Sequence, residues 1–360
     1  MRNALMTASG RILKSRLTKH LLVLLILHNS VDIGLRLYPK ILGQHFVNAT
    51  KSQFHTGRNG IFVNVTNPPH INRMKANYYS MIYHNGYMWH HQTDQYGFRN
   101  DAERVTADVV FLGDSYVYGL GVEASETMPS VFKSLSGLTV KNMGTNGLTA
   151  LSSAHLLDQY IEEFQPRLVI FVATVSDIIE TSEEITNGEL ATLGPVIRVN
   201  EIPHGSIYPS GVLAPEELSL NSYFVLALKH FIFNLKTPPE IRVQRSIRYA
   251  MDESFIGWRA NFTAIRWLHQ ICETHHAQLI IFPLVVDKGH ERFLTIYQGL
   301  GKRENIPIIP LIVDKESPEL LLTRNNDSHL SPLGNAKASR YLYSQLKEGG
   351  FLMGDPAVLN

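Results

Sequence analysis

Short runs of mainly apolar residues recur from residue 109 onwards, and most of them are rich in β-branched side chains. Runs of this kind are typical of strands buried in a parallel sheet, because helices cover both faces of such a sheet. We therefore predict about five parallel strands, at residues 109–112 (VVFL), 140–143 (VKNM), 167–173 (RLVIFVA), 278–284 (QLIIFPL) and 306–313 (IPIIPLIV).

Segments with the periodicity of amphipathic helices separate these strands. The second predicted helix runs from Trp258 to His275. The first lies between the second and third predicted strands and has apolar residues at helical spacing, at Leu156, Leu157, Tyr160, Ile161 and Phe164. Strands that alternate with helices indicate right-handed crossovers and helices on both faces of the sheet. The expected fold is an α/β three-layer α/β/α sandwich.

The tripeptide Gly113-Asp114-Ser115 directly follows the first predicted strand. Ligands of open α/β sheets bind beyond the carboxyl ends of the strands, so a hydroxyl at this position meets the ligand. Glycine allows a sharp turn that exposes backbone N–H groups, and these can stabilise the charge of a tetrahedral intermediate. Ser115 is therefore a candidate nucleophile, although a serine that merely ends a strand in a turn gives the same pattern.

A candidate base and a carboxylate to orient it occur near the C-terminus, at His329 and Asp327. A serine hydroxyl becomes an effective nucleophile when an imidazole accepts its proton, and a carboxylate fixes the tautomer of that imidazole. Ser331 as N-cap and Pro332 as first helical residue predict a helix, ending at Gly349, that anchors this loop. The alternative for His329 is an ordinary surface histidine.

These segments together resemble the SGNH/GDSL hydrolase family, from Val109 to about Leu346. The resemblance implies a flavodoxin-like fold in which the family's motifs follow a fixed order along the chain. It makes Ser115 the nucleophile and its own N–H one oxyanion donor. Gly147, at the end of the segment NMGTNG, would supply a second backbone N–H to the oxyanion hole.

The sequence departs from the family's pattern in two places. Ser176 stands where the family has an asparagine that donates to the oxyanion, so we expect a hydroxyl as the third donor, or else a cap for a helix that begins at Asp177. The usual spacing of the last motif puts the carboxylate at position 326, where this chain has Asn326. We favour Asp327, because an Asp-x-His variant occurs in similar polysaccharide-modifying members and a carboxylate stabilises an imidazolium.

Two regions lie outside the predicted core at 108–350. Residues 39–107 form a lead-in extension whose Asp-x-x-Gly-Phe-Arg segment is similar to one in membrane-anchored bacterial SGNH proteins. Residues 178–255 form an insertion with apolar runs at 223–228 and 231–233, which are too short to span a bilayer. We expect a helix that caps the sheet edge or the mouth of the site, with an interfacial membrane helix as the alternative.

The N-terminal residues 1–38 resemble a signal sequence or a membrane anchor. Five basic residues precede the apolar run at 21–27, and no small-x-small cleavage site is evident. A span from Leu17 to about Tyr38 would carry Asp32 and Arg36 one helical turn apart, where they can pair. We predict an uncleaved anchor and an exported catalytic domain, periplasmic or extracellular. The competing interpretation is a basic amphipathic helix on the membrane surface.

Composition bounds the remaining possibilities. The chain has 360 residues, 44% of them hydrophobic, and a formal charge of +1, so we expect one large domain and no nucleic-acid partner. Cys272 is the only cysteine, which excludes an intrachain disulfide. The 16 histidines show no zinc-like spacing, and no phosphate or dinucleotide motif occurs, so we expect neither a metal nor a cofactor.

The resemblance and the candidate triad lead to one expected activity. It is serine-dependent hydrolysis of an oxygen ester, with a small acyl ester or an acylated saccharide as substrate and an acetyl group removed from the sugar. Two alternatives stay open. One is an O-acyltransferase that passes the acyl group to a polysaccharide hydroxyl, and the other is a weakly active or inactive module that binds glycan.

Overall fold

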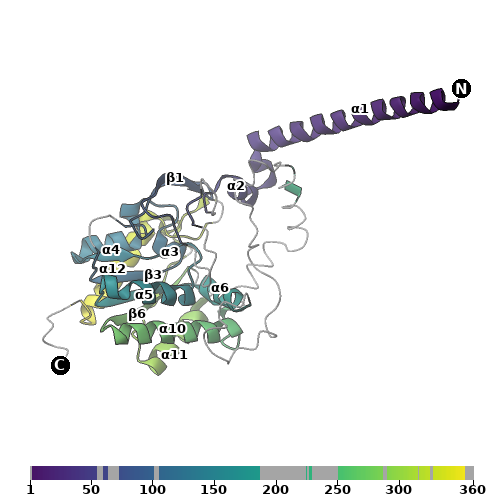
Figure 1. Cartoon of the computed structure of the whole chain (residues 1–360). Coiled ribbons are helices and arrows are strands. Elements are labelled where there is room, and N and C mark those ends of the chain that lie inside the picture. The colour runs from purple at the N-terminus through teal and green to yellow at the C-terminus, as the bar shows by residue number, and fades with distance from the viewer. Residues whose placement is uncertain are drawn as a thin grey trace.

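A five-stranded parallel sheet lies at the centre of the molecule in the computed structural model (Figure 1). Its order is β4-β3-β5-β6-β7, which is the order of a doubly wound, flavodoxin-like sheet. The strands are β3 (Val109–Gly113), β4 (Val140–Asn142), β5 (Leu168–Ala173), β6 (Gln278–Val285) and β7 (Leu311–Ile312). The predicted α/β class and its parallel strands are confirmed.

The structure describes residues 2–54, 60–63, 73–100, 105–186, 224, 227–228, 250–286, 290–314, 316–324 and 327–352. Most of the insertion at 178–255, with its apolar run at 231–233, lies outside these residues, as does Asn326. The helix expected over the sheet edge, and the division of the chain at residues 38 and 107, stay predictions.

The fifth strand is shorter than the sequence predicts. Before β7 begins at Leu311, Ile308 forms an isolated bridge with Ile281. Pro307 and Pro310 flank this bridge, and a proline has no N–H to donate to a neighbouring strand. The run IPIIPLIV therefore lies along the edge of the sheet, but only Ile308 and the two residues of β7 pair with β6.

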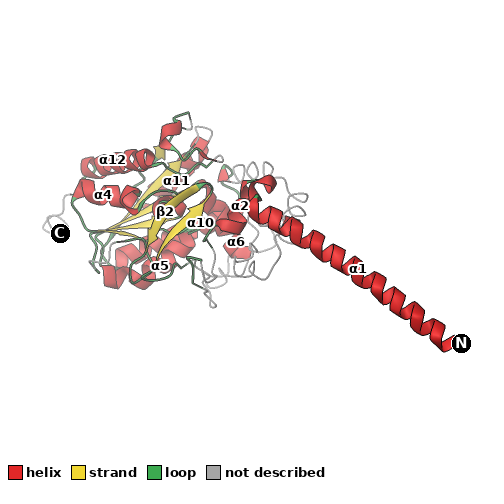
Figure 2. Ribbon diagram, turned by 90° about the horizontal axis from the view of Figure 1, so that it is seen from above, coloured by secondary structure: helices red, strands yellow, loops and turns green. Residues whose placement is uncertain are grey.

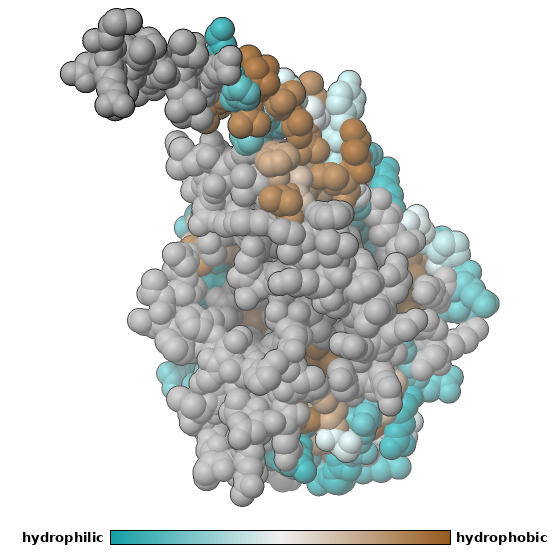
Figure 3. Space-filling view, turned by 90° about the vertical axis from the view of Figure 1, so that its right-hand side faces the viewer, coloured by the Kyte–Doolittle hydropathy of each residue, from teal (hydrophilic) through white to brown (hydrophobic). Residues whose placement is uncertain are grey.

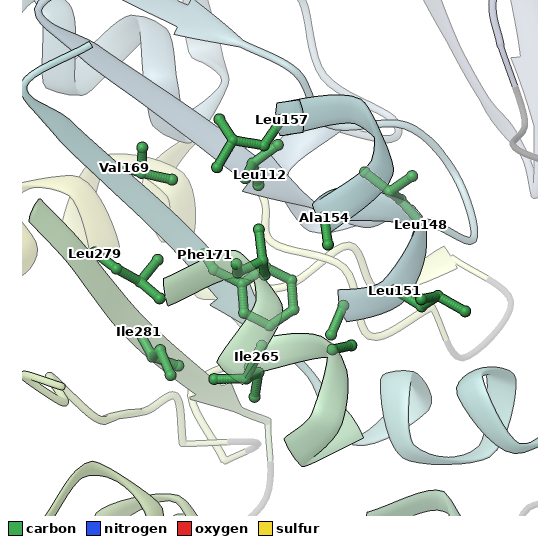
Figure 4. Close-up of a cluster of buried hydrophobic side chains, with 14 of the residues drawn as sticks. Leu112, Leu148, Leu151, Ala154, Leu157, Val169, Phe171, Ile265, Leu279 and Ile281 are labelled. Atoms are coloured by element: carbon green, nitrogen blue, oxygen red, sulfur yellow. The ribbon is translucent and has the colours of Figure 1, made fainter. Parts of the chain in front are cut away.

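Helices cover both faces of the sheet (Figure 2). The helices α4 (Met128–Ser136) and α12 (Pro332–Glu348) pack on one face, and α5 (Ala150–Phe164), α10 (Ile256–Thr274) and α11 (Glu291–Glu304) on the other. Successive side chains of β3 point to opposite faces, so Phe111 meets Phe132 of α4 while Leu112 joins the cluster of α5 and α10 shown in Figure 4. Both faces of β3 are therefore buried.

The N-terminal helix α1 (Arg2–Leu37) projects away from the domain (Figure 1), and exposed hydrophobic residues of its C-terminal half gather on the face shown in Figure 3. Its segment Lys19–Leu37 is long and apolar enough to cross a membrane, a property that N-terminal signal sequences share. The side chains of residues 21–27 are each more than half exposed. As predicted, Asp32 and Arg36 pair, with 2.7 Å between Oδ2 and Nε. The short helices η1 (Pro39–Leu42) and α2 (Gln44–Lys51) follow.

The lead-in extension contains a β-hairpin that packs against the core domain. Its strands β1 (Tyr79–His84) and β2 (Tyr87–Gln92) are joined by Asn85 and Gly86, whose φ angles are 49° and 91°. Positive φ at both central residues is what a type I′ hairpin turn requires. On one face of the hairpin, Ile82 and Trp89 are buried against Tyr118, which belongs to the short helix α3 (Ser115–Tyr118).

The Asp-x-x-Gly-Phe-Arg segment connects this extension to the loop after α3. The Arg99 guanidinium is buried and donates to four backbone carbonyl oxygens, at 2.7 Å for Gly119, 2.7 Å for Val122, 3.0 Å for His90 and 3.2 Å for Tyr118. Its planar fork of five N–H donors suits this arrangement. Arg99 therefore supports the residues that end the turn of helix begun by Ser115.

We expect Arg99→Lys to lower the free energy of unfolding by about 2–4 kcal/mol, because one ammonium group cannot reach all these carbonyls and leaves buried acceptors unpaired. Urea unfolding of the detergent-solubilised full chain measures the loss. Arg259→Lys, at an exposed position of α10, is the matched control and should change the value little. Equal stability of the two variants would contradict the proposed support by Arg99.

Candidate active site

The turn that carries Ser115 depends on Gly113 at the end of β3. Gly113 has a φ of 149°, and a Cβ there would lie 2.7 Å from Val117 Cγ2 and 2.9 Å from the Val172 carbonyl oxygen. No other residue fits without moving the adjacent strand β5. Ser115 is then the first residue of α3, where helix geometry leaves its backbone N–H without an intrahelical partner.

Asp114 caps α3 and joins the ends of two strands. Its Oδ1 accepts the Tyr116 N–H at 2.9 Å, and its Oδ2 accepts the hydroxyls of Thr174 at 2.8 Å and Ser176 at 3.2 Å. Burial raises the pKa of Asp114, although these hydrogen bonds and the charge of His329 oppose the shift. The structure thus gives Asp114 both roles that its position allows, helix cap and support of the loop.

The structure brings Ser115, His329 and Asp327 into one chain of hydrogen bonds. His329 Nε2 lies 2.7 Å from Ser115 Oγ, and His329 Nδ1 lies 2.6 Å from Asp327 Oδ1. An ionised carboxylate only accepts hydrogen bonds, so Nδ1 carries the ring proton. Nε2 is then the acceptor, and the Ser115 hydroxyl donates to it. This is the geometry in which an imidazole can remove the serine proton.

Asp327 is shielded, whereas His329 is open to solvent. Their side chains are 3% and 22% exposed. Burial by itself raises the pKa of Asp327, but hydrogen bonds from His329 and Asn85, with the charge of His329, more than offset burial and hold that pKa below its usual value. The carboxylate therefore stays ionised near neutral pH.

The loop of Asp327 and His329 is held at both ends. Leu321 bridges Leu330, and the Leu322 N–H donates to the His329 carbonyl oxygen at 2.7 Å. As predicted, Ser331 caps α12 by accepting the Gly334 N–H, at 3.1 Å. The ring of Tyr116 lies 4.8 Å from that of His329, and its hydroxyl donates to the Ser328 carbonyl oxygen.

The loop between β4 and α5 packs directly on α3. Asn142 Nδ2 donates to the Val117 carbonyl oxygen at 2.9 Å, and a Cβ on Gly144 would lie 2.4 Å from the Tyr118 backbone nitrogen. Gly147 follows in a turn with a φ of 73°. The structure therefore places the loop of Gly147 beside the helix of Ser115, and the role of Gly147 in an oxyanion hole stays a prediction.

Ser176 has its hydroxyl among other polar side chains of the site. Its Oγ lies 2.7 Å from Thr174 Oγ1 and 3.2 Å from Asp114 Oδ2. Since Thr174 itself donates to Asp114, the single Ser176 proton points to one of these two oxygens. The residue lies inside α6 (Val175–Thr186), so it does not cap a helix that begins at Asp177. Its expected donation to the oxyanion stays a prediction.

Two contributors to the site escaped the sequence analysis. Thr174 donates to Asp114, and Asn85 Nδ2 donates to Asp327 Oδ2 at 2.8 Å. Asn85-Gly86 between two alternating runs is a recognisable hairpin signal, but the pattern does not indicate what the turn touches. Within the described residues, no group of three or more His, Cys, Asp or Glu side chains is placed to hold a metal ion.

No family model matches the sequence, and no curated protein matches it. Among solved structures, a protein described as lipolytic and of the G-D-S-L family, from Desulfitobacterium hafniense, is 16% identical, with 66% of this chain and 97% of that chain covered and a TM-score of 0.38. The esterase EstA from Pseudoalteromonas sp. is 10% identical, and the match covers 67% of this chain and 98% of EstA, with a TM-score of 0.38. A family two carbohydrate esterase from Cellvibrio japonicus is 13% identical, and the match covers 70% of this chain and 64% of that esterase, with a TM-score of 0.36.

We expect Ser176→Ala to reduce kcat less than about tenfold, because its proton is engaged by Asp114 or Thr174 and two backbone N–H groups remain for an oxyanion. Asp114 keeps its bonds to Tyr116 and Thr174 in this variant. Steady-state kinetics with an activated acetyl ester measure the effect. A fall in kcat of about 10²–10³ with unchanged KM would instead identify Ser176 as an oxyanion donor.

Proposed function

We propose that this chain is a serine-dependent ester hydrolase of SGNH/GDSL type. The observation that carries the proposal is the hydrogen-bonded series Ser115, His329 and Asp327 at the carboxyl end of β3, which lies between β4 and β5. Ligands of doubly wound sheets bind where the strand order reverses, which is between β3 and β5 in this sheet. This location supports the proposed roles of Ser115 as nucleophile, His329 as base and Asp327 as the orienting carboxylate.

In the first step, Ser115 Oγ bonds to the ester carbonyl carbon while its proton moves to His329 Nε2. The carbonyl electron pair moves to the oxygen, and we propose that the N–H groups of Ser115 and Gly147 stabilise this oxyanion, with the Ser176 hydroxyl as a third, weaker donor in the substrate complex. Asp327 stabilises the imidazolium through Nδ1. The oxyanion then re-forms the carbonyl, the bond to the alcohol breaks, and His329 protonates the alcohol.

The acyl-serine is resolved by the reverse sequence of proton movements. His329 removes a proton from water, the water oxygen attacks the acyl carbon, and Ser115 Oγ leaves with the proton from His329. A carboxylic acid and the free enzyme result. An acceptor sugar hydroxyl in the place of water would make the same chain an O-acyltransferase, because the acyl-serine is common to both reactions.

The proposed substrate is an acylated saccharide at the membrane surface, and the acyl group is acetyl. The N-terminal helix supports this location, because its segment Lys19–Leu37 is long enough to span a bilayer. Basic residues at Arg2, Arg11, Lys14 and Arg16 precede the segment, and such residues stay on the cytoplasmic side. The catalytic domain would then lie on the opposite, exported side, where surface polysaccharides occur.

We expect Ser115→Ala and His329→Ala each to abolish product release from p-nitrophenyl acetate by the purified full chain, since the members of a triad act as a unit. Both variants should keep the circular dichroism spectrum of the wild type. A burst of p-nitrophenol from the wild type measures acyl-serine formation. Turnover that persists in Ser115→Ala would overturn the serine mechanism.

Adding a sugar acceptor to the same assay separates the alternatives. Turnover that does not respond to the acceptor is the result expected of a hydrolase, whereas acceleration with an acetylated sugar as product identifies a transferase. A wild-type chain that binds glycan and releases no p-nitrophenol would be a binding module, and the enzyme proposal would be withdrawn.

We expect Asp327→Asn to lower kcat by about 10³–10⁴ and Asn326→Ala by less than about tenfold, because loss of the carboxylate charge removes both the tautomer control and the stabilisation of the imidazolium. Steady-state kinetics of the two variants under identical conditions test the assignment. If the larger loss belongs to Asn326→Ala, the family's usual spacing applies and Asp327 is not the orienting residue.

A further inference from the structure

The tip of the β1–β2 hairpin contacts the loop that carries the proposed base. Asn85 Nδ2 lies 2.8 Å from Asp327 Oδ2. Next to this contact, the Arg324 N–H donates to the Tyr87 hydroxyl at 2.6 Å, and Arg324 Nη1 donates to the Gly86 carbonyl oxygen at 2.8 Å. Three successive residues of the hairpin therefore hold a loop that is far away in the sequence.

We infer that Asn85 is a positioning residue of the triad and acts through Asp327, an inference that rests on the proposed function. His329 occupies Asp327 Oδ1 with its ring Nδ1 and its backbone N–H, at 2.6 and 2.9 Å. Asn85 occupies the other oxygen. With both oxygens bonded, the carboxylate cannot rotate away from the imidazole. The carboxylate side chain is 3% exposed, so water offers little replacement for the lost donor.

An amide suits this position better than a cationic side chain. A lysine or arginine beside Asp327 would form an ion pair and reduce the negative charge that the imidazolium needs. The neutral Asn85 amide donates a hydrogen bond and leaves that charge in place. It also contributes to holding the pKa of Asp327 below its usual value. Hydrogen-bond partners that orient the ligands of metal sites typically affect activity about 10–100-fold, and we expect an effect of this size for a donor that orients Asp327.

Asn85 is itself held in place by the helix that follows the N-terminal anchor. Its backbone N–H donates to Asn48 Oδ1 at 2.9 Å, and Gln44 Nε2 donates to the same oxygen at 2.9 Å. Both partners belong to α2, which packs beside β1. The lead-in extension is therefore part of the active site, because it supplies a side chain to the triad and fixes the backbone of that side chain.

The central variant is Asn85→Gly, assayed in the detergent-solubilised full chain with p-nitrophenyl acetate. Glycine accepts the φ of 49° and preserves the hairpin turn, so the change removes the donor without straining the backbone. We expect kcat to fall about 10–100-fold and KM to change less than about twofold. Asn77→Gly is the matched control, because Asn77 also has a φ of 49°, is exposed and lies in the same extension. Equal kcat values for the two variants would overturn the inference.

A double-mutant cycle tests whether Asn85 acts through Asp327. In an Asp327→Asn background, the further change Asn85→Gly should lower kcat less than about twofold, since the carboxylate that it positions is already gone. A loss of the same factor as in the wild-type background would mean that the residue has a general structural role. Such additivity would overturn the inference.

The variant Asn85→Asp adds a pH readout. It keeps the shape of the side chain but sets a second carboxylate against Asp327, and two neighbouring carboxylates favour sharing one proton. The shared proton restores a donor, so the activity of Asn85→Asp relative to Asn85→Gly should rise as the pH falls from 8 to 5. A ratio that does not depend on pH would contradict the contact.

A measurement without turnover separates this inference from the proposed function. The proton between His329 Nδ1 and Asp327 gives a low-field NMR signal when the hydrogen bond is short, and loss of Asn85 should shift that signal or remove it by faster exchange. An identical signal in the wild type and Asn85→Gly would overturn the role of Asn85. Turnover that survives Ser115→Ala would overturn the proposed function alone.

Discussion

The carboxyl group of Asp114 is buried between the ends of β3 and β5, and the position of the proposed nucleophile depends on how its two oxygens are hydrogen-bonded. Buried polar oxygens are costly unless donors surround them. One donor comes from the turn that contains Ser115, and the hydroxyls of Thr174 and Ser176, which follow β5, lie 2.8 and 3.2 Å from the other carboxyl oxygen. Displacement of either segment would remove hydrogen-bond donors from this carboxyl group. The ends of β3 and β5 therefore keep a fixed separation, and this separation fixes the position of Ser115.

Around this centre, the site is built from segments that are remote in the chain. Asn142 and Gly144 hold the loop after β4 against α3, Arg99 supports the residues after α3, and the hairpin tip meets the loop of Asp327. Apart from the close approach at Gly144, these contacts are hydrogen bonds and most are shielded from water, which makes their geometry specific. A parallel sheet sets the coarse position of every loop, and these hydrogen bonds determine where the reacting atoms lie.

The sequence pattern was sufficient to predict those strands and helix ends that depend on neighbouring residues alone. The run LVIFVA has no polar residue and is buried on both faces, and Ser331-Pro332 supplies an N-cap and a first helical residue for α12. Ser115 and His329 could be singled out because their motifs carry recognisable neighbours, and the structure brings the two side chains within 2.7 Å of each other. The contact of Asn85 with Asp327 joins residues 242 positions apart, so no spacing rule reaches it. The short β7 shows why the predicted fifth strand was too long. Proline is tolerated in an edge strand, but it has no backbone N–H to donate to the neighbouring strand, so the pairing is interrupted.

The connection between α1 and α2 is short and structured. Residue 37 ends α1 and residue 44 begins α2, with one turn of 3-10 helix between them. Under the proposed anchoring, this link holds α2, which packs beside β1, close to the lipid headgroups, and the domain works within a thin layer above them. The rate at which the domain meets its substrate then depends on the surface density of acylated chains and on diffusion in two dimensions. The concentration of substrate in the bulk solution no longer controls this rate.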